Sequence, residues 1–274
     1  MSRDCAPVVV GIDGSSTAVS AALWAVDEAI DLDAPLRLVY VTGLSSTPPH
    51  AEDYRADVCE GKAALASATR AVEALGKPVK VQTEVLTGTP SVMLTVEARD
   101  AAMICVGSTG IGRMASLYLG STATDLANAA DCSVAIVRPA ADAAAPASKG
   151  WVVIPVNAYT DNHAVVEAGF REARLRHIPV LALGVWNSQV GGTAYDVLDH
   201  MTAEWQSLHP GVHVYPVATE EGVAHFLDQQ PELQCLVMLD STAADQIAPI
   251  VGRPHRHPHT DVSRAVLVVR TSKP

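Results

Sequence analysis

Residues 103–139 constrain the fold of this chain more than any other segment, because they set three glycines and a hydroxyl at fixed spacing between two apolar runs. The segment reads MICVGSTGIGRMASLYLGSTATDLANAADCSVAIVRP and predicts a buried strand, a glycine-bearing loop, a helix and a second buried strand. Two residues separate Gly107 from Gly110, and nine more lead to Gly120 and Ser121. Such loops typically hold phosphate, since glycine admits close approach and free N–H groups at a helix start point at the anion.

The spacing G-x2-G-x9-G-[ST] differs from the spacings of the two best-known phosphate loops. The chain has no G-x-x-x-x-G-K-[ST], and no G-x-G-x-x-G opens the helix, so neither a P-loop nor a dinucleotide-binding fingerprint is supported. At Gly107, Gly110, Gly120 and Ser121 the chain instead resembles the universal stress protein family, and specifically its ATP-binding members.

The first half of the chain predicts alternating strands and helices. Expected strands are residues 7–12, 36–41, 80–86, 103–106 and 134–137. Expected helices begin after Ser15 or Ser16, span roughly 56–75 and 91–98, and run from an N-cap at Ser121 to Ala130. This order predicts an open parallel sheet with right-handed crossovers. The resemblance implies the same α/β fold, of the Rossmann-like, adenine nucleotide α-hydrolase-like type.

The second half looks like a repeat of the first. Residues 140–150 (AADAAAPASKG) are typical of a linker, which separates a domain at 1–139 from one at 151–274. Residues 151–156 restart the pattern, and Pro155 and Asn157 take the places of Gly11 and Asp13. An expected helix at 162–176 and strands near 180–185, 212–217, 233–239 and 265–270 complete the match. We therefore expect two tandem domains, each with a mostly parallel five-stranded sheet and helices on both faces.

The second copy departs from the first at the glycine motif. Asp240 and Ser241 stand where the first half has Val106 and Gly107, and residues 252–261 (GRPHRHPHTD) replace the third glycine, the hydroxyl and much of the helix. Prolines remove N–H donors and an aspartate repels phosphate, so we expect a degenerate domain that does not hold ATP in the same way. The alternating His255, His257 and His259 suit either a metal site or, as we favour, a surface loop.

The resemblance implies ATP, with Mg²⁺, as the cofactor of the first domain. It implies adenine at the sheet edge near Asp13 and Val41, and phosphates on the glycine loop. The implied binding residues are Gly11, Ile12, Asp13, Val41, Gly107, Ser108, Gly110, Arg113, Gly120, Ser121 and Thr122.

Several of these residues keep a second interpretation. Asp13 can accept from the ribose, hold Mg²⁺ through water, or only cap its helix. Arg113 can reach a phosphate or be a plain surface residue, and Thr122 can be only a first-turn helix residue. The glycines at 107 and 110 can be turn residues without a ligand.

Composition and charge narrow the class of partner. The chain of 274 residues is 49% hydrophobic and carries a formal net charge of −11, with no run of Lys or Arg, which disfavours nucleic acid and anionic membranes. Five cysteines without C-x-x-C give no disulfide framework. No signal segment is evident and no apolar run approaches about 18 residues, so we expect a soluble, cytoplasmic protein.

The resemblance implies an ATP-binding regulatory protein of the stress-response type rather than a dedicated enzyme. The sequence offers no Walker lysine and no candidate base for phosphoryl transfer. The alternatives are a weak ATPase on the same fold and an interaction protein with a vestigial site. The terminal apolar strands, 134–137 and 266–269, can pair with each other or with another chain, and we favour a homodimer. We also expect a regulatory protein partner, whose identity is unknown.

Overall fold

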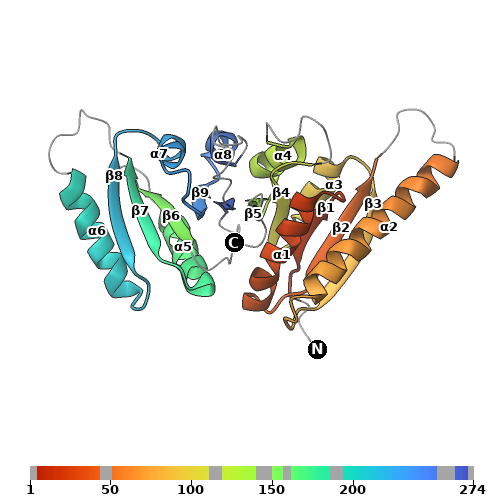
Figure 1. Cartoon of the computed structure of the whole chain (residues 1–274), viewed down its shortest axis with the longest axis horizontal. Coiled ribbons are helices and arrows are strands. Elements are labelled where there is room, and N and C mark those ends of the chain that lie inside the picture. The colour runs from red at the N-terminus through yellow and green to blue at the C-terminus, as the bar shows by residue number, and fades with distance from the viewer. Residues whose placement is uncertain are drawn as a thin grey trace. The chain divides into compact units, whose positions relative to one another are not determined.

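The computed structural model describes residues 5–43, 51–110, 119–139, 150–156, 162–185, 194–251 and 263–270. The chain divides into two compact units, Met1–Arg138 with Arg270–Pro274, and Pro139–Val269. Each is an α/β unit built on a parallel sheet (Figure 1).

The strands of the first unit follow the order β3-β2-β1-β4-β5, and all pair in parallel. The elements are β1 (Val8–Ile12), α1 (Ser16–Asp31), β2 (Leu36–Thr42), α2 (Ala51–Glu73), β3 (Val81–Thr87), α3 (Pro90–Glu97), β4 (Met103–Gly107), α4 (Ser121–Ala129) and β5 (Ser133–Arg138). Right-handed crossovers place α1 and α2 on one face and α3 and α4 on the other (Figure 1).

The strand order reverses between β1 and β4. From β1 the chain moves outward to β2 and β3, and it then returns to β4 on the other side of β1. Val10 of β1 therefore pairs with Leu38 of β2 and Cys105 of β4. All three side chains are fully buried, or nearly so, because helices cover both faces of the sheet. The carboxyl ends of β1 and β4 splay at this switch point, where ligands of open α/β sheets bind.

The second unit repeats this topology with the strand order β10-β9-β6-β7-β8. Its elements are β6 (Trp151–Val156), α5 (His163–Arg176), β7 (Val180–Val185), α6 (Ala194–Leu208), β8 (Val214–Thr219), α7 (Val223–Gln229), β9 (Cys235–Asp240), the 3-10 helix η3 (Ala244–Gln246), α8 (Ile247–Val251) and β10 (Arg264–Val269). Glu28 of α1 and Glu172 of α5 lie at matching positions of the two copies, and both are fully buried. Arg171 and Arg176 pair with the Glu172 carboxylate. The α/β class predicted from the sequence is confirmed.

The structure corrects several predicted boundaries. The N-cap of α4 is Gly120, which is extended at φ −64° and ψ 147°, so Ser121 is the first helical residue and not the cap. The helix α2 begins at Ala51 rather than near Ala56, and Thr42 belongs to β2, where its hydroxyl donates to Leu86 of β3 at 3.1 Å. Helices α6, α7 and α8 were not predicted, because the second half carries weaker capping signals.

Some predictions fall outside the described residues. These are the predictions for the linker residues 140–149, for Asn157, for Arg113 and for the histidines at 255, 257 and 259.

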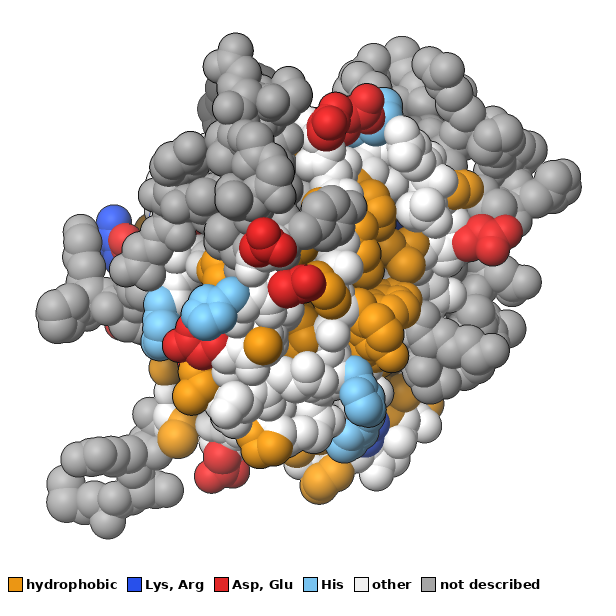
Figure 2. All heavy atoms as spheres, turned by 90° about the vertical axis from the view of Figure 1, so that its left-hand side faces the viewer, with side chains coloured by type: hydrophobic (Ala, Val, Ile, Leu, Met, Phe, Trp, Pro, Cys, Tyr) orange, Lys and Arg blue, Asp and Glu red, His pale blue; other side chains and the backbone are white. Residues whose placement is uncertain are grey.

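Two surface properties can be read from the described parts. Within them, no helix is both long and apolar enough to cross a membrane. On the face in Figure 2, hydrophobic side chains are the most extensive of the coloured types, acidic side chains and histidines are scattered among them, and little Lys or Arg is visible among the described residues. That face offers little positive charge to a polyanion.

Gly61 in the middle of α2 gives a test of how closely this helix packs on β2. A Cβ at Gly61 would lie 2.5 Å from the Tyr40 ring, which is 8% exposed. Helix propensity alone predicts that Gly61→Ala stabilises by about 1 kcal/mol. We expect the opposite, a loss of about 1–2 kcal/mol in urea unfolding, because the methyl overpacks the ring.

A Tyr40→Ala background provides the control for that substitution. With the ring removed, Gly61→Ala should become neutral or stabilising, as the propensity scale predicts. Equal effects of Gly61→Ala in both backgrounds would contradict the steric explanation.

Candidate functional site

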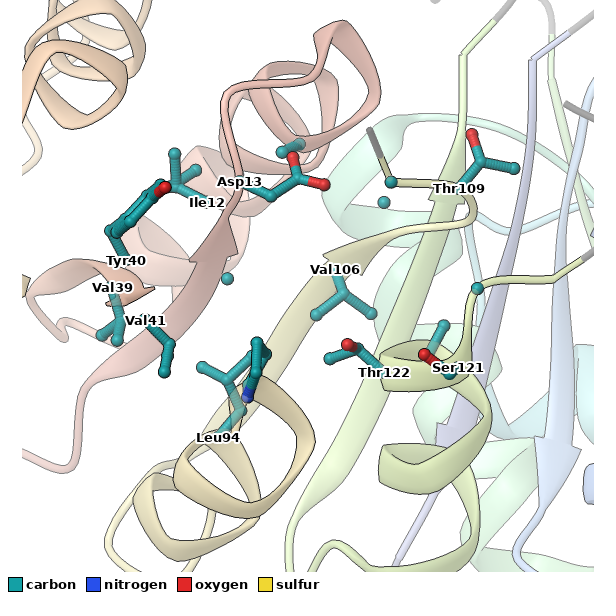
Figure 3. Close-up of a pocket in the computed structure, with 17 residues that line it drawn as sticks. Ile12, Asp13, Val39, Tyr40, Val41, Leu94, Val106, Thr109, Ser121 and Thr122 are labelled. Atoms are coloured by element: carbon teal, nitrogen blue, oxygen red, sulfur yellow. The ribbon is translucent and has the colours of Figure 1, made fainter. Parts of the chain in front are cut away.

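A cavity of about 440 Å³ opens at the carboxyl ends of β1, β2 and β4, beside the starts of α3 and α4 (Figure 3). Its size lies within the range of small-molecule sites. The lining residues are Gly11, Ile12, Asp13, Ala18, Val39, Tyr40, Val41, Pro90, Leu94, Val106, Gly107, Thr109, Gly110, Gly120, Ser121, Thr122 and Ala123.

One end of the cavity is polar and is formed by backbone. The start of α4 is tied to the glycine loop, since the Gly120 N–H donates to the Ser108 carbonyl at 2.9 Å. Because the N-cap of α4 is a glycine, no capping side chain accepts from the first-turn N–H groups of the helix. Ser121 and Thr122 of this first turn line the cavity (Figure 3). The positive end of the α4 dipole therefore faces the cavity, where the N–H groups of the first turn can donate hydrogen bonds to a ligand.

The other end of the cavity is apolar. Val39 and Val41 come from β2, Leu94 comes from α3, and Val106 comes from β4 (Figure 3). Gly11 is required here by close approach, since a Cβ at Gly11 would lie 2.9 Å from a Leu94 methyl carbon. The apolar end of the cavity can thus cover a flat apolar group of a ligand, while the charged groups of that ligand lie at the polar end.

Asp13 projects into the cavity from the end of β1. Its Oδ1 accepts from the Ser15 N–H at 2.9 Å, and a Cβ on Gly110 would lie 2.8 Å from its Oδ2. The N-cap of α1 is Ser15, whose Oγ accepts from the Ala18 N–H at 3.1 Å. Asp13 is therefore not the cap of α1, and its second oxygen faces the glycine loop. Among the described residues, no group of three or more His, Cys, Asp or Glu could hold a metal.

The structure brings most of the sequence-predicted residues to this cavity. Among the described ones, only Ser108 does not line the cavity; Arg113 lies outside the described residues. Ser108 is fully buried beneath the loop, where its N–H donates to Val137 at 2.8 Å and its carbonyl accepts from Gly120. Ser108 thus supports the loop rather than lining the cavity.

Sequence reasoning missed several lining residues, mainly on β2 and α3. These are Ala18, Val39, Tyr40, Pro90, Leu94, Val106, Thr109 and Ala123. Pro90 and Leu94 were missed because α3 returns to the switch point only through the fold, although Pro90 at the first turn after a strand marks a helix start that could have been placed there. Thr109 lies inside the motif, between Gly107 and Gly110, and it is the Thr109 backbone carbonyl that accepts a hydrogen bond from Thr17.

Tyr40 anchors the cavity wall to α2. Its hydroxyl donates to Asp57 Oδ1 at 3.2 Å, and Asp57 Oδ2 accepts from the Gly43 N–H at 3.1 Å. Burial, followed by the neighbouring Asp57 carboxylate, raises the pKa of Tyr40 to about 12.

The fold and the cavity define a doubly wound α/β protein with a cavity of small-molecule size at its switch point. More particularly, the chain belongs to the universal stress protein family. A model described as Universal stress protein family matches residues 6–138. Universal stress protein Rv2624c of Mycobacterium tuberculosis is 44% identical over 267 residues, or 96% of both chains.

Further comparisons agree over both halves of the chain. Universal stress protein Rv3134c of the same organism is 39% identical over 252 residues, which cover 89% of this chain and 92% of that one. The crystal structure of a universal stress protein from Archaeoglobus fulgidus covers 97% of each chain with a TM-score of 0.69 at 14% identity. At that identity the structural likeness shows the shared fold.

The Tyr40 pKa predicts how stability depends on alkaline pH. The folded state holds the Tyr40 proton up to about pH 12, whereas the unfolded chain releases it near the ordinary value of 10. The contribution of this group is therefore fully present below pH 10 and is lost as the pH rises toward 12. We expect the free energy of unfolding to fall more steeply over this window in the native chain than in Tyr40→Phe. Parallel pH profiles of the two proteins would contradict this.

Proposed function

We propose that the first unit binds an adenine nucleotide, ATP, and that this chain acts as a nucleotide-responsive regulatory protein. The observation that carries the proposal is the two-ended cavity, in which the uncapped start of α4 lies opposite an apolar end formed by β2 and α3. Backbone donors at a helix start suit phosphates, and an apolar cleft suits a base. Membership of the universal stress protein family supports the same assignment.

Local donors, rather than the overall field, must hold the phosphates. ATP brings about four negative charges to a chain whose own net charge is −11. The N–H groups at Gly110, Ser121 and Thr122 are proposed as donors, and Arg113 as a neighbouring cation. The Asp13 carboxylate beside Gly110 would repel a bare phosphate, so we propose that it either holds Mg²⁺ through water or accepts from the ribose.

The proposed role is regulatory rather than catalytic. A ligand shifts a conformational equilibrium only through its different affinity for the two states. In this proposal, ATP binding changes the stability or the surface of the chain, which a protein partner reads in the cytoplasm. We further propose that the chain forms a homodimer. A weak ATPase and an interaction protein with a vestigial site are the alternatives that the experiments below separate.

The first experiment identifies the nucleotide that accompanies the native protein. We expect chromatography of the freshly purified, denatured protein to release ATP at about one equivalent per chain, because a tightly bound ligand stays with the folded chain. A ligand at a hundred times its dissociation constant also stabilises the folded state by about 2.7 kcal/mol. Gly120→Glu should release none, since its carboxylate would stand where phosphate is proposed to bind. A Cβ at Gly120 would lie 3.6 Å from its nearest neighbour, so the backbone at this position has room for a side chain to begin.

Gly120→Gln is the matched control, since it has the same shape without the charge. We expect it to retain more nucleotide than Gly120→Glu. No released nucleotide and no thermal shift with added Mg-ATP would overturn the proposal and favour the interaction protein. Steady release of ADP by the native protein, lost in Asp13→Ala, would favour the weak ATPase.

Metal removal combined with Asp13→Asn separates the two roles proposed for Asp13. If the carboxylate holds Mg²⁺, chelation should weaken ATP binding several-fold in the native protein but not in the variant. If it accepts from the ribose, the variant should bind both ATP and adenosine more weakly, because the amide oxygen stays on the Ser15 N–H and an NH2 group, which cannot accept, then faces the ligand. Titration calorimetry with both ligands measures these effects. Unchanged binding of both ligands by Asp13→Asn would exclude both roles.

A further inference from the structure

We infer that Thr17 is a positioning residue for the glycine loop: its hydroxyl fixes the Thr109–Gly110 peptide so that the Gly110 N–H faces the bound phosphates. The inference rests on the proposed function, because it assigns an orienting group to that same site. Thr17 lies in the first turn of α1 and does not line the cavity. It would therefore act from behind the loop.

The contacts of Thr17 connect α1 to the loop. Its Oγ1 donates to the Thr109 carbonyl, a bond between residues 92 positions apart in the sequence. Its Oγ1 also lies 2.9 Å from Ser15 Oγ. A Cβ on Gly107 would lie 2.7 Å from Thr17 Oγ1 and 2.9 Å from the Thr17 carbonyl carbon. The first glycine of the motif is thus required by the close approach of α1.

The direction of every bond in this chain of hydroxyls can be assigned. Thr17 has one hydroxyl proton, and it is used for the Thr109 carbonyl. The 2.9 Å contact must therefore have Ser15 Oγ as donor and Thr17 Oγ1 as acceptor. Ser15 Oγ in turn accepts from the Ala18 N–H at 3.1 Å. The bonds run in one direction from the start of α1 to the loop carbonyl, an arrangement in which each bond strengthens the next.

The geometry of the peptide transfers this constraint to the ligand side. In a trans peptide the C=O and the following N–H point in opposite directions. Since the Thr109 carbonyl points at Thr17, the Gly110 N–H points away from α1. Gly110 N lies 3.9 Å from a Cβ position on Gly120, and within the described residues the Gly110 N–H has no acceptor. The freed donor is thus turned toward the start of α4, where the phosphates are proposed to lie.

The proposed role of Thr17 needs its hydroxyl and does not need its methyl group. A serine keeps the hydroxyl that donates to Thr109, whereas a valine keeps the branched shape and removes the donor. Without that bond, the peptide can rotate and the Gly110 N–H loses its fixed direction. The loss affects phosphate binding and leaves the apolar end of the cavity, formed by β2 and α3, unchanged.

The test compares ATP and adenosine binding by the full chain, native and substituted. Thr17→Val should weaken ATP binding about tenfold, which corresponds to ~1.4 kcal/mol and to the loss of about one hydrogen bond. Its affinity for adenosine, which carries no phosphate, should stay within about twofold of the native value. Thr17→Ser should bind both ligands as the native chain does, because it restores the donor.

Thr202→Val is a matched control in the second unit. The Thr202 hydroxyl also donates to a carbonyl, that of Asp199 at 3.1 Å, and Thr202 belongs to α6 and does not line the cavity. The control measures what the loss of such a bond does to stability alone. We expect it to leave the affinity for ATP unchanged.

Each outcome bears on one of the two proposals. If the native chain binds ATP and Thr17→Val binds it equally well, the role of Thr17 is overturned while the nucleotide proposal stands. Equal losses of ATP and adenosine binding also overturn that role, since they indicate general damage to the cavity. If the native chain binds no ATP, the proposed function itself is overturned, and the inference with it.

A measurement on the native protein decides the matter if Thr17→Val does not fold. The amide proton of Gly110 should move downfield in NMR spectra when ATP is added, because the N–H then donates to a phosphate oxygen. It should hardly move with adenosine. A Gly110 amide that ATP leaves unmoved, in a protein that binds ATP, overturns the inference.

Discussion

The parallel pairing of β1 with β4 is the contact on which the rest of the first unit depends. Val8 pairs with Met103 and Val10 with Cys105, so two segments separated by most of the unit become neighbours at its centre. This pairing reverses the strand order and leaves the carboxyl ends of β1 and β4 without a covering connection. The cavity lies there because the helices after these strands, α1 and α4, leave on opposite faces of the sheet.

The glycine loop is held by the same junction. Its outer side is fixed to α1 by the Thr17 hydroxyl, and its inner side is fixed to β5 and α4 through the backbone of Ser108. The loop therefore presents its donors from a rigid support, which lowers the ordering cost of binding an anion. The second unit has the same strand order but has Asp240 at the equivalent strand end, where its carboxylate accepts from Thr242 N at 2.6 Å. The two copies thus share a fold, and the glycine spacing occurs in the sequence of the first alone.

The duplicated fold is visible in buried charge as well as in topology. Glu28 and Glu172 are both fully buried, in helices that occupy the same place in the two copies. A carboxylate out of water requires partners, and Glu172 obtains them from Arg171 and Arg176. Glu28 and Glu172 are separated by the same number of residues as Gly11 and Pro155, so the sequence aligns the pair, but only the structure shows that both carboxylates are buried.

The sequence by itself determined the α/β class, the strand-helix alternation and the glycine spacing, because these follow from local periodicity and from residues near one another in the chain. Gly107, Gly110 and Gly120 therefore led to the cavity directly. Tertiary structure alone decided the apolar wall and the supports, since Leu94 reaches the cavity and Thr17 reaches the loop from helices whose positions depend on strand order. It also decided that Gly120, not Ser121, caps α4 and that Ser108 lies beneath the loop. The physical reason is that close approach between distant segments leaves little trace in local sequence, apart from the glycines that permit it.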